Sequence, residues 1–156
     1  MPAELAVGGS APTFKLDRDG GGTVSLADFK GKKLVLFFYP KADTSGCTSE
    51  ALAFSALLPT FTKAGCAVLG VSPDPVKAQD KFKAKHNLTV ALAADPTHEM
   101  LTAYGVWGKK SMYGRSYMGV IRTTLLIDPR GRIAQIWPKV KVPGHADEVL
   151  AAAQAM

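Results

Sequence analysis

The residue best suited to chemistry in this sequence is Cys47. It ends a turn containing Pro40, Thr44 and Gly46, which links a strongly apolar run at 34–39 to an amphipathic segment. We predict a buried strand for the run and a helix for the segment, whose apolar residues recur every three or four positions. Cys47 then lies in the first helical turn, where unpaired amides and the helix dipole favour a thiolate. The pattern therefore predicts a nucleophilic cysteine.

Two neighbours of Cys47 add to this chemistry. The Thr44 hydroxyl can donate and accept hydrogen bonds shortly before the sulfur, and Pro40 supplies a rigid wall without a competing donor. The structural alternatives are a buried, inert Cys47 and a Thr44 that only favours the turn.

The spacing Pro-x-x-x-Thr-x-x-Cys after an apolar strand resembles the active-site loop of the peroxiredoxins. The fuller segment 38–51 is similar to the bacterioferritin-comigratory (PrxQ) branch, with further matches at 105–108 and 122–128. The resemblance covers nearly the whole chain. It implies a thiol-dependent peroxidase in which the Cys47 thiolate attacks hydrogen peroxide or an alkyl hydroperoxide, leaving a sulfenic acid that a thiol reduces.

The resemblance also implies roles for residues outside the loop. Arg122, in a run expected to be a strand, corresponds to the family's strand arginine, whose fixed cation would hold the thiolate and a peroxide oxygen. The alternative is an ordinary exposed strand arginine. Glu50, about one turn past Cys47, either orients Arg122 or is simply favoured near a helix N-terminus. Trp107 either walls the pocket or is an ordinary core or surface aromatic.

The remaining elements are expected from periodicity and from turn and cap residues. We expect Pro59 to kink or end the Cys47 helix early, and the stretch from Trp107 to Tyr117 to be a loop. The other expected elements are a hairpin at 13–26, strands at 67–72 and 89–93, helices opened by Asp74-Pro75 and Asp95-Pro96, a hairpin at 120–137, and a last helix at 145–154.

These elements predict one α/β domain, residues 1–156, with a mixed central sheet flanked by helices. The resemblance implies a thioredoxin-like fold with an N-terminal β-hairpin, and residues 1–10 are expected to be an exposed lead-in. The length suits a single core of ordinary size.

Composition limits the partners. The net charge is +6, but Lys and Arg are dispersed, so we expect neither nucleic-acid nor membrane binding. The start lacks a signal-peptide pattern, no stretch is long enough to span a membrane, and a cytoplasmic location is expected. No metal-ligand spacing, Cys-x-x-Cys or phosphate-binding loop is present, so neither a metal nor a cofactor is expected.

Two other function classes compete. A Cys-dependent hydrolase would need one of His86, His98 or His145 within reach of Cys47. A non-enzymatic thioredoxin-fold binding or holdase module would expose a large apolar patch. For the peroxidase, the expected reductant is thioredoxin, glutaredoxin or a small thiol, and the expected state is a monomer, with a weak dimer as the alternative.

The chain departs from its family in how the sulfenic acid would be resolved. Many PrxQ proteins place a resolving cysteine five positions after the nucleophile, where this chain has Leu52; others place it on the next helix, which here has none. Cys66 opens the strand behind the Cys47 helix, more than about 20 Å along that helix axis, whereas a disulfide needs α-carbons within about 7 Å. Cys66 is thus a weak candidate, and we predict a 1-Cys cycle completed by an external thiol.

Overall fold

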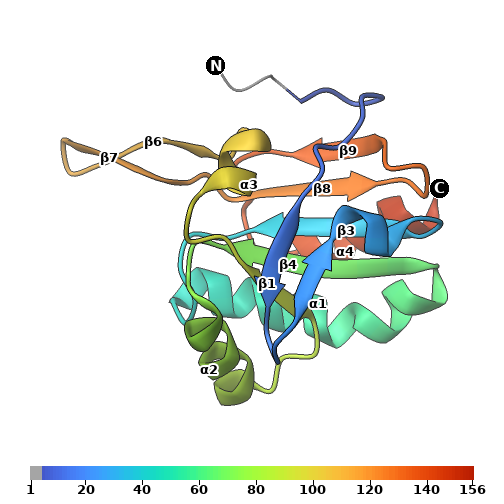
Figure 1. Cartoon of the computed structure of the whole chain (residues 1–156), viewed down its shortest axis with the longest axis horizontal. Helices are drawn as coiled ribbons and strands as arrows, with labels where there is room; N and C mark the ends of the chain where they lie inside the picture. The colour runs from blue at the N-terminus through green and yellow to red at the C-terminus, as the bar shows by residue number, and fades with distance from the viewer. Residues whose placement is uncertain (1–4) are drawn as a thin grey trace.

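A seven-stranded mixed sheet forms the centre of the molecule (Figure 1). The computed structural model describes residues 5–156. The strands lie in the order β2-β1-β5-β4-β3-β8-β9. Their bounds are β1 Lys15–Arg18, β2 Thr23–Ser25, β3 Lys33–Phe38, β4 Cys66–Ser72, β5 Ala91–Ala94, β8 Thr123–Ile127 and β9 Ile133–Trp137. The helices are η1 Leu26–Phe29, α1 Ser45–Lys63, α2 Val76–His86, α3 Glu99–Ala103 and α4 His145–Gln154.

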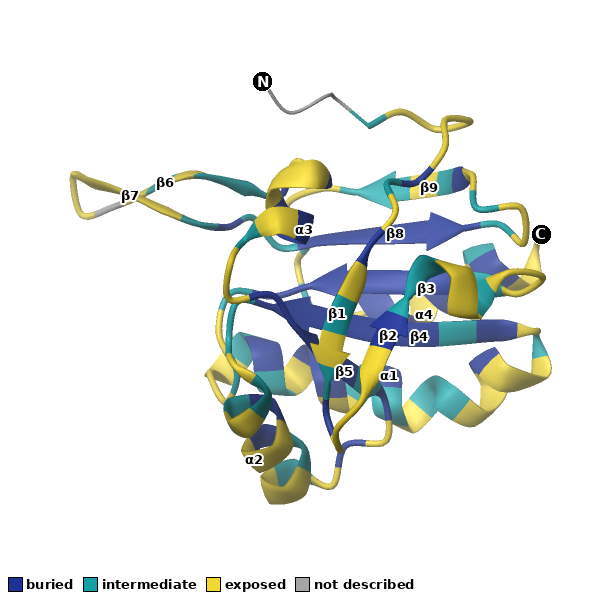
Figure 2. Ribbon diagram, in the orientation of Figure 1, coloured by how far each residue is buried: buried dark blue, intermediate teal, exposed yellow. Residues whose placement is uncertain are grey.

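Strand β3 lies at the centre because its residues are apolar on both faces. It pairs in parallel with β4 and antiparallel with β8. Val35 and Phe37 face a core shared with α1 and α4, whereas Leu34 and Leu36 face a second core that includes α3. Helices therefore cover both faces of the sheet, which explains the unbroken hydrophobic run in the sequence. Figure 2 shows this buried centre.

Of the kink or early end that we expected at Pro59, the early end is wrong, because helix α1 continues to Lys63. A proline leaves the carbonyl four residues earlier without its usual amide donor. Here that carbonyl, on Ser55, accepts a hydrogen bond from the Thr89 hydroxyl at 3.2 Å. A side chain beyond the helix thus satisfies the carbonyl that the proline leaves free.

The N-terminal hairpin is confirmed, with its strands slightly displaced from the predicted positions: β1 pairs antiparallel with β2. The predicted pairing of 120–127 with 132–137 is also confirmed by β8 and β9, and α4 has the predicted bounds. Asp74 is not the cap of α2, because Pro75 occupies that position and Asp74 binds elsewhere. Residues 1–4 of the expected lead-in lie outside the described residues.

The predicted loop at 107–117 is wrong. This region forms a separate antiparallel hairpin, β6 (Trp107–Met112) and β7 (Arg115–Val120). Tyr113 and Gly114 form its two-residue turn and both have positive φ, 53° and 77°, as the favoured hairpin turns require. The apolar alternation that would have predicted strands is missing because most of the hairpin faces water.

Strand β7 ends at Val120 and β8 begins at Thr123, so that a short non-strand segment separates them. Arg122 lies in this segment, not inside a strand as we had expected. Its carbonyl accepts a hydrogen bond from the Val140 amide at 2.9 Å, which anchors the backbone there. This segment frees the Arg122 side chain from the strict alternation of a strand.

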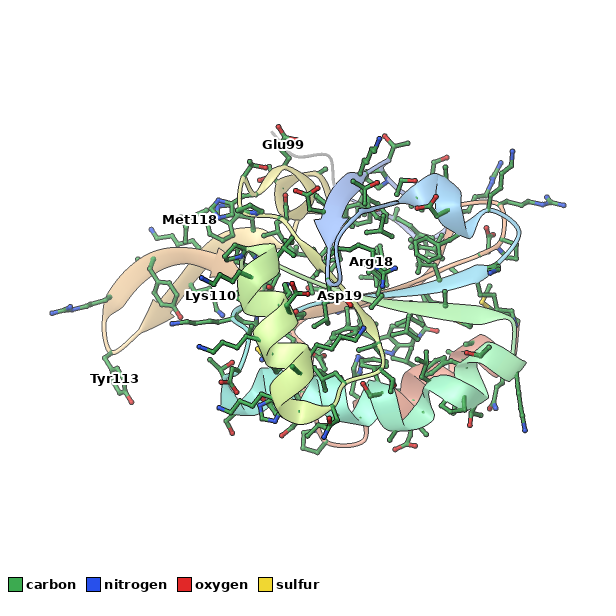
Figure 3. The ribbon with its side chains drawn as sticks, turned by 60° about the horizontal axis from the view of Figure 1, so that its bottom comes forward. Arg18, Asp19, Glu99, Lys110, Tyr113 and Met118 are labelled. Carbon is green, nitrogen blue, oxygen red and sulfur yellow. The ribbon has the colours of Figure 1, made fainter. Side chains whose placement is uncertain are left out.

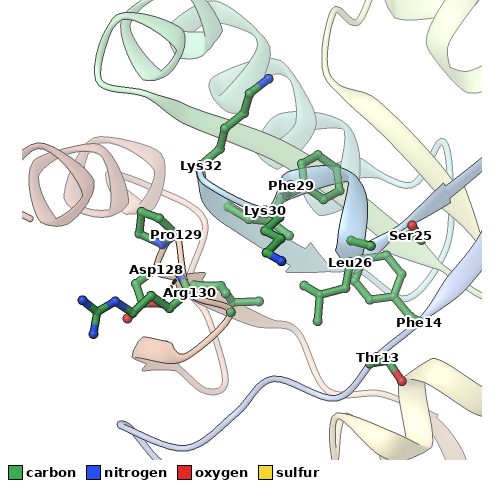
Figure 4. A pocket seen from close by; sticks show the side chains of 14 residues that line it. Thr13, Phe14, Ser25, Leu26, Phe29, Lys30, Lys32, Asp128, Pro129 and Arg130 are labelled. Atoms are coloured by element: carbon green, nitrogen blue, oxygen red, sulfur yellow. Dashed lines mark hydrogen bonds between the residues drawn. The ribbon is translucent and has the colours of Figure 1, made fainter.

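A hollow of about 280 Å³ opens near the start of β3 and the end of β8, lined by Leu34 and Ile127 (Figure 4). Cys47 follows the opposite end of β3, so this hollow is separate from the predicted site. Among the described residues, none of the helices combines the length and the hydropathy needed to cross a bilayer.

Candidate active site

The first turn of α1 presents Cys47 to the interior. Thr44 is the N-cap, and the first backbone bond of the helix runs from the Thr48 amide to the Thr44 carbonyl at 2.8 Å. The amides of Ser45, Gly46 and Cys47 precede that bond and are thus not used within the helix. Cys47 is only 1% exposed. Free amides at the start of a helix are groups that favour a negative charge nearby.

Arg122 joins Cys47 to Glu50. Its Nη2 donates to the Cys47 Sγ at 3.2 Å, and its Nη1 donates to the Glu50 Oε1 at 2.6 Å. The structure thus brings Arg122 into contact with Cys47 and Glu50, which are more than 70 residues away in the sequence. The planar guanidinium can serve both partners at once because its donors point in fixed, separate directions.

Gly46 makes room for this guanidinium. A Cβ at Gly46 would lie 3.2 Å from the Arg122 Nη2, closer than most side-chain contacts. Sequence analysis treated Gly46 only as a turn residue. A glycine in the first turn of a helix, one position before a candidate nucleophile, is a signal that could have indicated this close approach.

Burial governs the electrostatics of the Arg122–Glu50 pair. Burial raises the pKa of Glu50 to about 7, although Arg122 acts in the opposite direction. The second carboxylate oxygen, Oε2, is buried without a hydrogen-bond partner among the described residues. Burial alone would lower the pKa of Arg122, but Glu50 and Cys47 outweigh it, so the net shift is upward. Arg122 therefore stays charged against the sulfur.

The contacts of the three other predicted site residues, Thr44, Pro40 and Trp107, are with groups other than the sulfur. The exposed Thr44 hydroxyl donates to the Lys41 carbonyl at 2.8 Å, so its proton must turn before it can serve a substrate. Pro40 is half-buried directly after the strand residues that lead into the loop. Trp107 stacks on His98, with ring centroids 3.9 Å apart, and packs against the core opposite to that of Cys47.

A buried polar chain holds the loop before Cys47. The Ala42 amide donates to Asp74 Oδ2 at 2.7 Å, and the Ser72 hydroxyl donates to the same oxygen at 2.6 Å. Gln79 of α2 donates to the Ser72 hydroxyl and accepts from the Tyr39 hydroxyl. The role of Asp74 is not visible in the sequence, because Asp-Pro is also a common helix start and nothing in its spacing points to the loop.

A second contact ties the same loop to the end of α2. Asp43, whose φ is 62°, binds the His86 Nε2 at 2.7 Å and the Lys85 Nζ at 2.8 Å. These partners, His86 first and then Lys85, lower the pKa of Asp43. Because Asp43 lies at the surface, this ion pair contributes little stability by itself. It acts together with Asp74 to orient the loop on α2.

The histidines are engaged away from the sulfur. His86 pairs with Asp43, His145 bonds the Thr124 hydroxyl at 2.8 Å, and His98 stacks on Trp107. The contact made by the Cys47 sulfur is with Arg122. This arrangement differs from the Cys–His pair that a hydrolase requires.

The second thiol lies at the other end of the sheet. Cys66 opens β4, opposite Lys33 at the start of β3, whereas Cys47 follows the end of β3. Burial raises the pKa of Cys66 to about 12, with Lys33 only partly opposing it. The surroundings of Cys66 thus disfavour its thiolate.

Known proteins of one kind resemble this chain throughout. The model of the AhpC/TSA family matches residues 7–136. The chain is 49% identical to a putative peroxiredoxin bcp of Coxiella burnetii, over 94% of this chain and 97% of the relative. It is 44% identical to peroxiredoxin Bcp of Bacillus subtilis, over 94% and 93%.

Solved structures agree. Peroxiredoxin Q of Xanthomonas campestris aligns with a TM-score of 0.87 and 46% identity, covering 91% of this chain and 90% of that one. A mutant of Xylella fastidiosa PrxQ aligns with a TM-score of 0.93 and 39% identity, covering 98% of both. The predicted thioredoxin-like fold is confirmed.

The raised pKa of Glu50 predicts a pH-dependent stability. A raised folded-state pKa stabilises the fold fully below the ordinary value of 4.5 and loses this contribution as pH rises through about 7. Glu50→Gln removes the titration. The unfolding free energy of the wild type minus that of Glu50→Gln should therefore fall with rising pH, by about 1.4 kcal/mol per unit in this window. Urea unfolding at several pH values measures it.

The exposed Glu99→Gln is the control for that measurement and should follow the wild type across the window. A difference that instead grows as pH rises would show that the attraction of Arg122 outweighs burial at Glu50.

The Asp74 bond to the Ala42 amide predicts that loosening it exposes Cys47. Losing a hydrogen bond to a charged acceptor costs about 1.5 kcal/mol, so Asp74→Ala should speed the alkylation of Cys47 by iodoacetamide roughly tenfold. Asp74→Asn keeps an acceptor oxygen and should fall between the two. Lys81→Ala, at an exposed position on the following helix α2, is the control. Equal alkylation rates in Asp74→Ala and wild type would remove Asp74 from the positioning of the loop.

Proposed function

Because this chain belongs to the AhpC/TSA family, among the Bcp (PrxQ) peroxiredoxins, and is a thiol-dependent peroxidase, we propose that Cys47 is its peroxidatic nucleophile. The observation that carries this proposal is the 3.2 Å contact between Arg122 and the Cys47 sulfur at the start of α1. Two independent sources of positive potential, the guanidinium and the helix terminus, favour the thiolate there.

In the proposed reaction, the Cys47 thiolate attacks the terminal oxygen of a peroxide. A sulfur–oxygen bond forms as the oxygen–oxygen bond breaks, and the leaving oxygen takes up a proton as water or an alcohol. Negative charge moves from sulfur to the leaving oxygen during this step. Fixed donors aimed at that oxygen lower the barrier because they need no reorganisation. Arg122 and the Cys47 amide are placed for this role, and Thr44 joins them once its hydroxyl turns from Lys41.

Glu50 acts in this scheme by positioning Arg122. Its Oε1 takes the Nη1 donor, which leaves Nη2 directed at the sulfur. Without Glu50 the guanidinium could turn toward water, since burial of an unpaired cation is unfavourable. Pro40 is a rigid, half-buried residue at the start of the loop, whereas Trp107, the expected pocket wall, packs against the core on the opposite face of the sheet.

The substrates we propose are hydrogen peroxide and alkyl hydroperoxides. The bacterioferritin comigratory protein of Xanthomonas campestris, 46% identical, has been studied for its alkyl peroxide reduction activity. Thioredoxin, glutaredoxin or a small thiol is the proposed reductant, in a cytoplasmic monomer or weak dimer.

We further propose a 1-Cys cycle. Helix α2 contains no cysteine, and Leu52 occupies the other position at which the family carries a resolving thiol. Cys66 is buried at the opposite end of β3 from Cys47, and its raised pKa makes it a poor nucleophile at neutral pH. Reaction between the two sulfurs would require α1 to unwind.

The proposed roles predict a graded loss of peroxidase rate. Cys47→Ser should abolish peroxide consumption, because a serine hydroxyl is not ionised at neutral pH. Arg122→Ala and Thr44→Val should each lower the rate constant roughly tenfold or more, about 1.4 kcal/mol each. Stopped-flow peroxide consumption measures these rates, with circular dichroism as a fold check. Arg130→Ala, on the turn between β8 and β9, should match the wild type. Unchanged rates in both Arg122→Ala and Thr44→Val would leave only the nucleophile.

The 1-Cys cycle predicts the fate of the sulfur after one turnover. Mass spectrometry after one equivalent of peroxide should find sulfenic acid at Cys47, or a mixed disulfide once a thiol is added, with Cys66 free. Cys66→Ser should keep full turnover with an external thiol. A stoichiometric crosslink between Cys47 and Cys66, within or between chains, together with lost turnover in Cys66→Ser would contradict this cycle.

A further inference from the structure

The β6–β7 hairpin projects from the body of the protein as an arm (Figure 1). Its two strands pair only with each other and form a sheet separate from the central one. An isolated two-stranded hairpin is at best marginally stable in water. This arm, residues 107–120, is held at its base, where Trp107 stacks on His98 and Gly108 lies against Ile121.

The arm carries a composition unusual for a solvated surface. It contains Lys109, Lys110 and Arg115 and no carboxylate. Tyr113 is 97% exposed, Tyr117 43% and Met118 52%, and Figure 3 shows Tyr113 at the outer end of the arm. Aromatic residues, methionine and arginine are the types enriched where proteins bind one another. The arm thus combines exposed apolar groups with positive charge of a single sign.

The arm stands close to the proposed peroxidatic centre. Arg122, which contacts the Cys47 sulfur, follows the end of β7 by two residues. In Figure 1 the arm and the start of α1 lie at the same side of the molecule. A macromolecule that reached the Cys47 sulfur from outside would therefore meet the arm.

We propose that the β6–β7 arm is a docking surface for an acidic protein dithiol that reduces the Cys47 sulfenic acid. This inference rests on the function proposed above. Positive charge without carboxylates selects an acidic partner and repels a second copy of this chain. The exposed Tyr113, Tyr117 and Met118 favour a folded protein surface over a nucleic-acid backbone, for which three cations are few.

The chemistry that this partner completes is balanced. Its first thiolate attacks the sulfenic sulfur, so that a disulfide bond forms and the oxygen leaves as water. Its second thiol then attacks the mixed disulfide and releases the Cys47 thiolate. The dithiol supplies both electrons and leaves as an intramolecular disulfide.

The charge of the arm can be changed without loosening the arm itself. Lys110 is excluded, because its Nζ donates to the Val120 carbonyl at 3.0 Å and braces the hairpin. Lys109 and Arg115 are exposed, and the test variant is Lys109→Glu/Arg115→Glu. Lys15→Glu/Lys32→Glu, at two exposed positions outside the arm, changes net charge equally and is the matched control.

Each protein is assayed for hydrogen peroxide turnover with two reductants in parallel. One is dithiothreitol, which is small and uncharged, and the other is a recombinant bacterial thioredoxin of net negative charge, recycled by its reductase. The arm variant should lose roughly tenfold or more in kcat/KM for thioredoxin, with a weaker dependence on salt, and keep wild-type turnover with dithiothreitol. The control variant should resemble the wild type with both.

A second variant tests the apolar part of the surface. Tyr113→Ser/Met118→Ser should raise the KM for thioredoxin and leave dithiothreitol turnover unchanged. Dithiothreitol turnover also shows that each variant is folded.

Several outcomes would overturn the docking proposal alone. These are an arm variant equal to the control with thioredoxin, or a wild type that dithiothreitol reduces and thioredoxin does not. Binding of a labelled single-stranded oligonucleotide that the arm variant loses, with thioredoxin kinetics unchanged, would assign the arm to nucleic acid instead. A wild type without peroxide turnover even with dithiothreitol would contradict the proposed role of Cys47, a separate failure.

Discussion

The shared guanidinium of Arg122 is the interaction on which the proposed site depends. It contacts the Cys47 sulfur and the buried Glu50 carboxylate at the same time, through two different nitrogens. Neither partner would be placed favourably in the interior without this cation, since isolated charges are costly there. The arginine in turn requires the open face of Gly46 and a backbone held by the Val140 amide. Three separate segments of the chain, the start of α1, the stretch at Arg122 and the stretch at Val140, must therefore come together before the sulfur has its charged partner.

The sheet supplies the rigid frame for that contact. Strand β3 leads into the Cys47 loop, and its neighbour β8 begins directly after Arg122, so their antiparallel pairing brings the two residues together. Asp74, just before α2, and Lys85 and His86 at the end of α2 then hold the loop through Ala42 and Asp43. Catalytic groups held by packed elements and by hydrogen bonds from neighbouring residues keep their geometry without reorganisation. In this ordered arrangement the sulfur is buried. The surface around the site therefore affects how a reducing partner could reach it.

The two cysteines lie in different surroundings. Cys47 lies at a helix start against a guanidinium, whereas Cys66 lies at a buried strand end with a raised pKa. Both are buried to a similar degree, so burial alone does not distinguish them. At Cys66 the nearby Lys33 only partly opposes the effect of burial on the pKa, whereas the Cys47 sulfur accepts a hydrogen bond from the Arg122 guanidinium at the start of a helix.

The sequence by itself determined the local features of this protein. The apolar run of β3, the turn before Cys47, the hairpin of β8 and β9 and the bounds of α4 follow from periodicity and turn residues that act over short distances. The peroxiredoxin resemblance was most specific in the Cys47 loop, with further matches at 105–108 and 122–128. Tertiary structure decided whatever depends on a distant partner. Thr89 lets α1 continue past Pro59, the Asp74 carboxylate binds the Ala42 amide instead of capping α2, and Arg122 meets Glu50 in a break between strands. The β6–β7 arm was not predicted because most of it is exposed. A hairpin exposed to water on most of its surface needs no alternation of apolar and polar residues, so its sequence lacks the pattern that indicates a buried strand.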